Sequence, residues 1–232
     1  MNRLPSDIIR LIQVDQLLLP DHYYLDLHDR CYFFKEYTPG EGYNYSDGNR
    51  LISNVKKSPL KKGLAEYHFK YDAIIKCAEL LRSIYNSTDY WQNSTFVPIP
   101  SSKCMEDPEY DDRIVQICRG MSPNADVRSL VFQIRTTIAS HTVKDGERLK
   151  PEQLLALYRI DENLCNPPPK HIIIVDDMLT TGSHFKAMKT ILQKRFPGTP
   201  IEGVFITRRR ILPDKDNESV FNQLVNKFNP NL

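Results

Sequence analysis

The chain has 232 residues, of which 41% are hydrophobic and 26% are charged, as is usual for a globular protein with a substantial core. Its 31 basic and 29 acidic residues give a formal net charge of +2, which argues against a dedicated nucleic-acid binder. No apolar run approaches the roughly 18 residues of a membrane span, and the five cysteines lack zinc-site spacing. Asp7, Arg10 and Asp15 interrupt the first apolar residues, unlike a signal peptide. These features predict a cytoplasmic protein with free thiols and no membrane partner.

The N-terminal part of the chain mixes helical, strand-like and loop-like patterns. Ser6 can cap a helix over 6–19, in which apolar residues share one face. The aromatic segment 31–37 predicts a strand, and the Gly-, Tyr- and Asn-rich segment 38–49 predicts a loop. Apolar residues at helical spacing predict a second helix over 64–86.

Strands and helices alternate from about residue 95 onward. We expect strands over 96–100, 129–135, 171–175 and 202–207. We expect helices after an Asp107–Pro108 cap and over 151–159, 183–195 and 218–228. Such a β-α-β-α-β series predicts an α/β fold with a mostly parallel sheet flanked by helices. Residues 91–232 would form this domain, and residues 1–90 would form a helical and strand extension packed on it.

The strongest chemical signal lies in residues 172–184. Four apolar residues lead into Asp176 and Asp177, and Thr180-Thr181-Gly182 then precedes the predicted helix. In open α/β folds, ligands bind at the carboxyl ends of the strands, where these carboxylates would lie. Backbone N–H groups and hydroxyls at a helix start suit phosphate. The segment therefore predicts a sugar-phosphate site, and two solvated aspartates beside an ordinary helix cap are the alternative.

Residues 175–183, Val-Asp-Asp-Met-Leu-Thr-Thr-Gly-Ser, resemble the signature loop of type I phosphoribosyltransferases. The resemblance implies that fold, and it implies transfer of a phosphoribosyl group from phosphoribosyl pyrophosphate to a nitrogen base with release of pyrophosphate. Asp176 and Asp177 would be the catalytic residues, binding the ribose hydroxyls and contacting Mg²⁺. The ligand would also be bound by the rest of the loop, namely Met178, Leu179, Thr180, Thr181, Gly182, Ser183 and His184.

Two positions in this loop depart from the family pattern. Thr180 stands where purine-salvage members often have an acidic base, which makes a 6-oxopurine acceptor less expected. His184 stands where many members have Thr or Ser. A histidine can donate to phosphate, pack against the sheet or contact a base, and the sequence leaves these alternatives open.

Two further segments match the family in position. Ser101, Ser102 and Lys103 follow the predicted strand 96–100, where the family places its pyrophosphate-binding loop, and we add Arg135 to this group. The polar segment 136–150 would be a flexible hood that closes over the ligand and excludes water. Solvated surface roles are the alternative for each of these residues.

The ComF-like branch of the family is the most similar. Its motifs resemble Val97-Pro98-Ile99-Pro100 and Leu51-Ile52-Ser53-Asn54-Val55-Lys56, although its four-cysteine zinc module has no counterpart here. The basic runs at 56–62 and 208–210 could contact the phosphates of a nucleic acid. Such runs are more often solvated surface, so nucleic acid is a possible but not a favoured partner. Besides an enzyme, the sequence thus leaves open a non-catalytic module that binds nucleotide or phosphoribosyl pyrophosphate and a ComF-like DNA-processing accessory protein. It also leaves a homodimer open.

Overall fold

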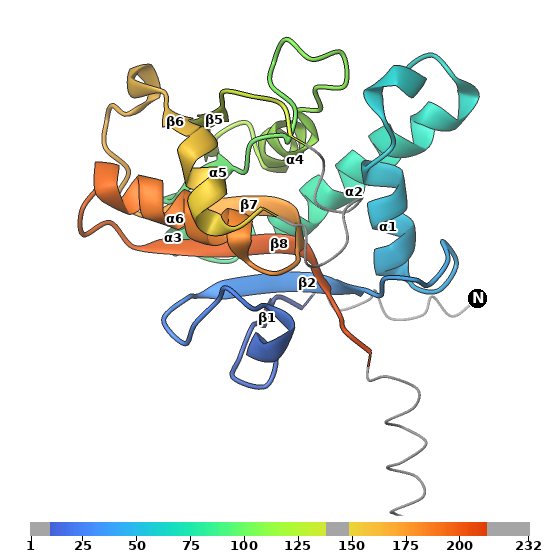
Figure 1. Ribbon diagram of the computed structural model, residues 1–232, viewed down its shortest axis with the longest axis horizontal. Coiled ribbons are helices and arrows are strands. Elements are labelled where there is room, and N and C mark those ends of the chain that lie inside the picture. The colour runs from blue at the N-terminus through green and yellow to red at the C-terminus, as the bar shows by residue number, and fades with distance from the viewer. Residues whose placement is uncertain (1–9, 138–148, 213–232) are drawn as a thin grey trace, which may run out of the picture.

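The computed structural model describes residues 10–137 and 149–212, which have an α/β architecture (Figure 1). Among these residues, six strands form one sheet in the order β1-β2-β8-β7-β3-β4. The strands are β1 (Ile12–Gln13), β2 (Cys31–Tyr37), β3 (Thr95–Pro98), β4 (Asp126–Val127), β7 (Ile172–Leu179) and β8 (Ile201–Arg209). Only β1 runs antiparallel to its neighbour, β2. The predicted class, a mostly parallel sheet flanked by helices, is confirmed.

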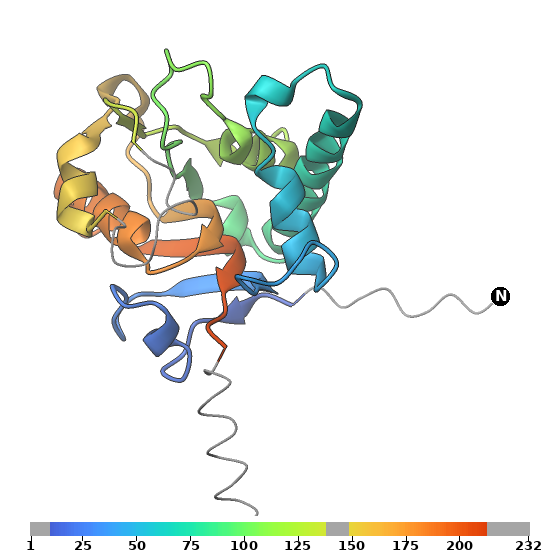
Figure 2. The same ribbon diagram turned by 45° about the vertical axis from the view of Figure 1, so that its right-hand side comes forward.

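Helices cover both faces of this sheet. They are α1 (Asp47–Val55), α2 (His68–Tyr85), α3 (Asp89–Gln92), α4 (Arg113–Met121), α5 (Pro151–Leu157) and α6 (Ser183–Arg195). Figure 2 shows α1 and α2 on one side of the molecule and α5 and α6 on the other. Within the described part of the chain, no helix combines the length and apolar character needed to cross a membrane.

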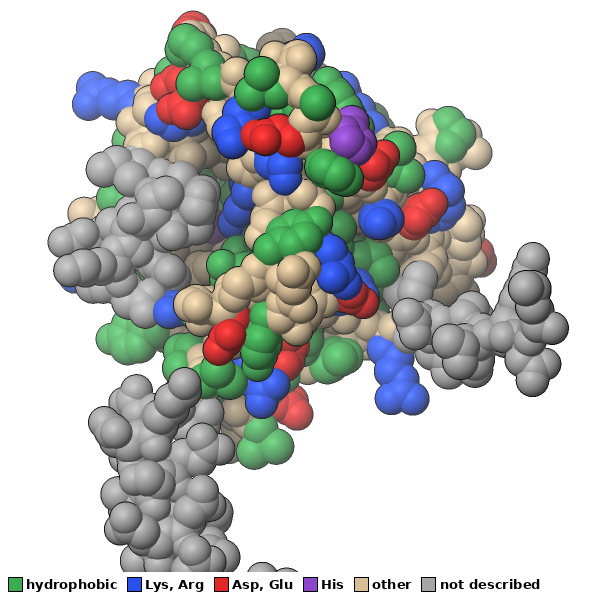
Figure 3. Space-filling view, turned by 90° about the vertical axis from the view of Figure 1, so that its right-hand side faces the viewer, with side chains coloured by type: hydrophobic (Ala, Val, Ile, Leu, Met, Phe, Trp, Pro, Cys, Tyr) green, Lys and Arg blue, Asp and Glu red, His purple; other side chains and the backbone are tan. Residues whose placement is uncertain are grey.

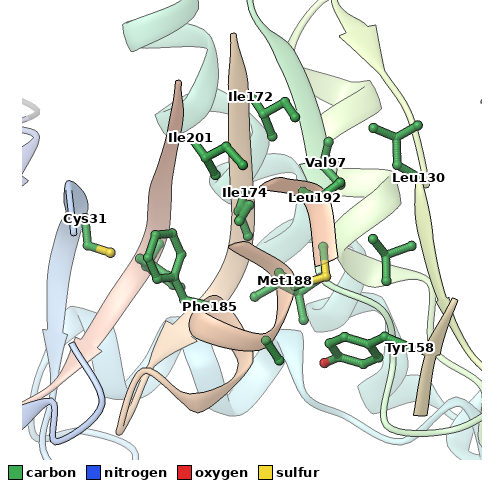
Figure 4. Close-up of a cluster of buried hydrophobic side chains, with 14 of the residues drawn as sticks. Cys31, Val97, Leu130, Tyr158, Ile172, Ile174, Phe185, Met188, Leu192 and Ile201 are labelled. Atoms are coloured by element: carbon green, nitrogen blue, oxygen red, sulfur yellow. The ribbon is translucent and has the colours of Figure 1, made fainter. Parts of the chain in front are cut away.

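The central strand β7 is apolar on both faces because helices bury both of them. Ile172 and Ile174 belong to a core cluster with Phe185 and other α6 residues (Figure 4). Ile173 and Val175 belong to the opposite cluster, which includes α1, α2 and α4. This alternation follows from the two-residue period of a strand, and it explains why the segment is apolar without interruption.

The N-terminal residues join the same sheet. The strand predicted over 31–37 is confirmed as β2, which lies between β1 and β8. The helix predicted over 6–19 is wrong in its described part, because Ile12 and Gln13 pair with Phe33 and Tyr32 on the otherwise open edge of β2. Strand pairing along an available sheet edge overrides the weak helical pattern.

Helix α1 replaces the end of the loop that we predicted over 38–49. The hydroxyl of Ser46 accepts a hydrogen bond from the backbone N–H of Asn49 at 3.0 Å and caps the helix. The Asn49 amide also bonds the backbone of Thr38, which closes the preceding loop. A capping serine followed by an apolar stripe was the signal for this helix.

Two other predicted elements differ from the structure. The helix expected after Asp107–Pro108 begins instead at Arg113, because Asp107 bonds the N–H of Glu109 in a local turn. The strand expected over 129–135 is shorter, β5 (Val131–Gln133), and it pairs antiparallel with β6 (Tyr158–Ile160) outside the main sheet.

The remaining elements lie largely as expected. The helix predicted over 183–195 is α6, and the helix predicted over 64–86 is α2, which a short 3-10 turn precedes. The predicted helix 218–228 and most of the predicted hood 136–150 lie outside the described residues.

Candidate functional site

The order in which strands are added to the sheet reverses between β3 and β7. From β3 the chain crosses through α4 to β4 on one side, whereas from β7 it crosses through α6 to β8 on the other. Pro98 pairs with Val175, so the segments that follow both residues lie at the same carboxyl edge. Open α/β sheets bind ligands at such switch points, because the two departing connections leave a crevice between them.

A cavity of about 100 Å³ lies at this edge. Of the residues predicted from the sequence, it is lined by Ser101, Ser102, Asp176, Asp177, Met178, Thr180 and His184. The structure thus brings the segment after β3 together with the Asp-Asp loop. It adds two cations, Lys56 and Arg113.

Asp177 is the most enclosed acidic residue of the site, with a relative exposure of 2%. Its Oδ2 accepts a hydrogen bond from Arg113 Nε at 2.7 Å, and its Oδ1 lies 3.2 Å from Lys56 Nζ. Burial opposes ionisation, but the charges and hydrogen bonds of Lys56 and Arg113 outweigh it and hold the pKa of Asp177 well below its usual range. Asp177 is therefore a carboxylate at neutral pH.

Asp176 has a different environment from its neighbour. Its side chain is partly exposed, and Oδ1 accepts the backbone N–H of Asp177 at 2.8 Å. Burial and the negative charge of Asp177 raise the pKa of Asp176 to about 7, because Lys56 and Arg113 offset only part of this cost. Near neutral pH, Asp177 is therefore ionised, whereas Asp176 is protonated in part of the molecules.

The Thr180–Gly182 turn joins β7 to α6. Tyr24 donates its backbone N–H to the carbonyl of Thr181 at 2.8 Å, and the imidazole of His22 bonds the carbonyl of Thr180. A hollow of only about 10 Å³ lies between this turn and the start of α6, which is room for one water molecule. The larger cavity reaches this turn only at Thr180.

Gly182 provides a test of how tightly this turn is held. Its φ is +84°, and an added Cβ would lie 2.7 Å from Leu25 Cδ2. Gly198 has a similar φ of +79° with no atom within 4 Å of an added Cβ, so it is a matched control. We expect Gly198→Ala to lower the free energy of unfolding by about 1 kcal/mol, and Gly182→Ala by about 1–3 kcal/mol more. Urea denaturation measures both, and equal losses would contradict the close approach of Leu25.

His184 packs inward from the first turn of α6. Its Nδ1 lies 2.8 Å from the hydroxyl of Tyr158 on β6, a side chain that is almost fully buried. Loss of hydration, helped by the charge of Lys56, lowers the pKa of His184 to about 4. The ring is therefore neutral at pH 7 and packs against β6, which was one of the alternatives that the sequence left open. His184 also lines the cavity, so a contact with a ligand stays a prediction.

This environment predicts how His184 titrates. Because the folded pKa lies below the unfolded value of 6.5, the neutral ring contributes stability above pH 6.5 that is lost as the pH falls toward 4. The full effect corresponds to about 3 kcal/mol. We expect the ring resonances to titrate near pH 4 in NMR spectra, and the stability of His184→Gln relative to the wild type to be higher at pH 4 than at pH 6.5. A titration midpoint near 6.5 would contradict the enclosed position of the ring.

Two predicted pyrophosphate ligands lie away from the Asp176–Asp177 pair. Lys103 forms an ion pair with Glu109 at 3.2 Å and lines a neighbouring cavity of about 180 Å³. Arg135 is exposed and lines neither cavity. Of the four residues predicted to bind pyrophosphate, only Ser101 and Ser102 line the cavity that contains Asp176 and Asp177.

Lys56 and Arg113 were not identified as site residues from the sequence. Lys56 follows the last residue of α1, and Arg113 is the first residue of α4. Arg113 also bonds Asp111, which pairs with the buried Lys70 at 2.6 Å. Two adjacent carboxylates at a buried sheet edge require countercharges, which was the signal for both cations. Lys56 also ends the segment 51–56 that resembles a motif of the ComF-like branch.

The donor set around the pair offers little for a resident metal ion. Among the described residues, no group of three or more His, Cys, Asp or Glu side chains could hold one. Both Asp177 oxygens contact cations, whereas Asp176 Oδ2 has no partner within the described ranges.

No protein-family model matches the chain, and no curated protein matches it either.

Proposed function

We propose that the protein is a phosphoribosyltransferase with the type I fold. It binds phosphoribosyl pyrophosphate and transfers the phosphoribosyl group to a nitrogen base, with release of pyrophosphate. The main support is the position of Asp176 and Asp177 at the switch point, beside the Thr180–Gly182 turn and opposite Ser101 and Ser102. Carboxylates accept hydrogen bonds from ribose hydroxyls, while hydroxyls and helix N-termini bind phosphate.

The reaction breaks the bond between C1 of ribose and a pyrophosphate oxygen and forms a bond from C1 to nitrogen. The electron pair leaves with pyrophosphate, so the side chains that stabilise this anion matter most. Lys56, Arg113, Ser101 and Ser102 line the cavity and supply positive charge and hydroxyl donors. Asp176 and Asp177 orient the ribose ring. The acceptor loses its proton to solvent or to a second group, because Thr180 supplies no base.

Magnesium fits this site as a partner of the ligand. Asp176 would contact it through Oδ2, and ligand oxygens and water would supply the other positions, as Mg²⁺ prefers. The ion would neutralise charge on the leaving pyrophosphate.

A DNA-binding role has less support from the surface. Lys61 pairs with Glu66 at 2.8 Å, and Arg208 pairs with Asp21 at 2.7 Å and with Glu36. Basic and acidic side chains are interspersed on the face shown in Figure 3. These basic residues therefore have local countercharges, which weakens the case for a continuous phosphate-binding surface.

Calorimetry with phosphoribosyl pyrophosphate and Mg²⁺ tests the proposal. We expect saturable heat of binding, followed by pyrophosphate release when a panel of nitrogen bases is added. Binding without release for any base would indicate a regulatory module that uses the same contacts. If millimolar ligand produced no heat, the proposed ligand class would be wrong.

A further inference from the structure

The carbonyl groups and the N–H groups of the Thr180–Gly182 turn have different surroundings. The three carbonyls accept hydrogen bonds, the first from the ring of His22, the second from the N–H of Tyr24 and the third from the N–H of Lys186. Among the described residues, the structure shows no acceptor for the N–H groups of 181–183. Because C=O and N–H of a trans peptide unit point in opposite directions, bonding the first two carbonyls turns the N–H groups of the same units away from their donors.

The side of the turn opposite these donors adjoins the Asp176–Asp177 pair. The small hollow at the turn is lined by Thr180 and Gly182, but by neither His22 nor Tyr24. It shares Asp176 and Thr180 with the cavity of the site. No side chain caps α6, which begins directly after the turn. N–H groups without an acceptor at a helix start favour an anion, which under the proposed function is the 5-phosphate.

The donors to the first two carbonyls belong to residues 19–29, which we call the strap. The strap is fixed to α6 by the fully buried side chain of Asp29, which pairs with Lys186 at 2.6 Å and with Lys189 at 2.7 Å. It is fixed to β8 by Asp21, which pairs with Arg208 at 2.7 Å. These ion pairs hold the strap independently of the turn, so the strap can determine where the turn lies.

His22 is the strap residue whose side chain bonds the turn, and it is fully buried. A carbonyl oxygen only accepts, so Nδ1 must hold the proton that bonds Thr180. Burial lowers the pKa of His22, so the ring is neutral at pH 7 and Nε2 has no proton. Nε2 is also buried, with no hydrogen-bond partner in the described part of the chain. An apolar side chain would avoid the cost of this unpaired nitrogen, which indicates that the ring is retained for its bond to Thr180.

We propose that the strap, through His22, positions the Thr180–Gly182 turn so that its N–H groups bind the phosphate of a phosphorylated ribose. His22 is a positioning residue, since it acts through the backbone of the turn and touches no ligand. The inference rests on the proposed function and adds to it. It assigns part of the phosphate affinity to a side chain that lies 158 residues before the turn in the sequence.

Titration of ribose 5-phosphate into isotope-labelled protein tests the inference, with the amide resonances of 181–183 followed by NMR. We expect saturable shifts of these amides in the wild type. His22→Leu removes the donor and should weaken ribose 5-phosphate by about 10-fold, because the turn is then less preorganised. His22→Asn has a side-chain N–H close to the position of Nδ1 and should restore most of the affinity. A role in filling space alone would be served better by leucine than by asparagine.

The matched control is His171, another buried histidine, which lies just before β7 at the end of the strand opposite the turn. Its ring lies 2.6 Å from the hydroxyl of Ser94. His171→Leu should lower the free energy of unfolding, because it leaves this hydroxyl without its partner. It should change neither the affinity for ribose 5-phosphate nor the amide shifts of 181–183.

A second variant loosens the strap without altering the ring of His22. Asp29→Asn removes the two ion pairs with α6. It also removes a negative charge, which on electrostatic grounds alone would favour an anion. We nevertheless expect the affinity for ribose 5-phosphate to fall by about threefold or more, because the turn loses its fixed position. Urea denaturation identifies any variant that fails to fold, and Asp29→Asn decides the test if His22→Leu does not fold.

The outcomes separate the inference from the proposed function. Unchanged affinity in the folded variants, or an equal loss in His22→Leu and His22→Asn, would overturn the inference. Binding of ribose 5-phosphate to the wild type without shifts at 181–183 would overturn it too, and each of these results leaves the proposed function intact. If the wild type bound neither ribose 5-phosphate nor phosphoribosyl pyrophosphate, the proposed function itself would fail.

Discussion

Replacing Asp177 with alanine is expected to lower the free energy of unfolding by about 3–5 kcal/mol. The variant leaves Arg113 and Lys56 in a poorly hydrated site without the carboxylate that each of them contacts. A buried charge without its partner is far more costly than a missing surface ion pair, because water cannot take the place of the carboxylate. Urea denaturation at pH 7 measures the decrease in stability.

The matched control is the exposed pair between Lys61 and Glu66, whose side chains are 51% and 49% exposed. Glu66→Ala removes a carboxylate from a cation at 2.8 Å but should change stability far less than Asp177→Ala does, because solvent screens the exposed pair. Combining Asp177→Ala with Lys56→Met should recover part of the stability, because one unpaired cation is then removed. If Asp177→Ala and Glu66→Ala cost the same, the site would be better hydrated than the structure shows.

Replacing Asp176 with asparagine is expected to have the opposite effect on stability. Because the pKa of Asp176 in the folded state, about 7, lies above its ordinary value of 3.8, the folded protein binds this proton more tightly than the unfolded chain. Stability therefore falls as the pH rises from about 4 to 7 and stays lower above pH 7. The pKa difference corresponds to about 4 kcal/mol, and partial exposure of the side chain reduces the expected gain to about 1–3 kcal/mol.

The pH dependence supplies the control for this prediction. Below pH 4, wild type and Asp176→Asn should be equally stable, because the wild-type carboxyl is then protonated in both states. Above pH 7 the variant should be more stable, and it should bind phosphoribosyl pyrophosphate more weakly. A stabilising substitution that removes ligand binding is the behaviour expected of a functional residue kept at a cost to stability. Equal stability of the two proteins at pH 8 would contradict the raised pKa.

His184 and Asp176 oppose each other over nearly the same pH range. Lowering the pH protonates Asp176 favourably and His184 unfavourably, so their contributions to wild-type stability partly cancel. The two single variants should therefore show stronger and opposite pH dependences than the wild type does. This cancellation is a property of the folded site alone, since the unfolded chain has neither displaced pKa.

The sequence by itself determined the elements whose signals are local. The apolar run of β7, the acidic pair and the glycine turn before α6 all lie within about a dozen residues, and α6 has the predicted bounds 183–195. The strand 31–37 was equally clear from its aromatic composition. Predictions from such patterns agree with the structure because one short segment contains the whole pattern, including the apolar residues that are buried on both faces of the sheet.

Only the tertiary structure decided which charges surround the acidic pair. Arg113 reaches Asp177 across 64 residues, and Lys56 reaches it from the end of α1. Lys103, which follows the predicted pyrophosphate loop directly, pairs with Glu109 instead. Which cation meets a buried carboxylate depends on strand order and on the faces that the crossovers cover, and no local spacing encodes either. The acidic pair could therefore be predicted from thirteen residues, whereas its countercharges depend on how the sheet positions helices α1 and α4, whose ends hold Lys56 and Arg113.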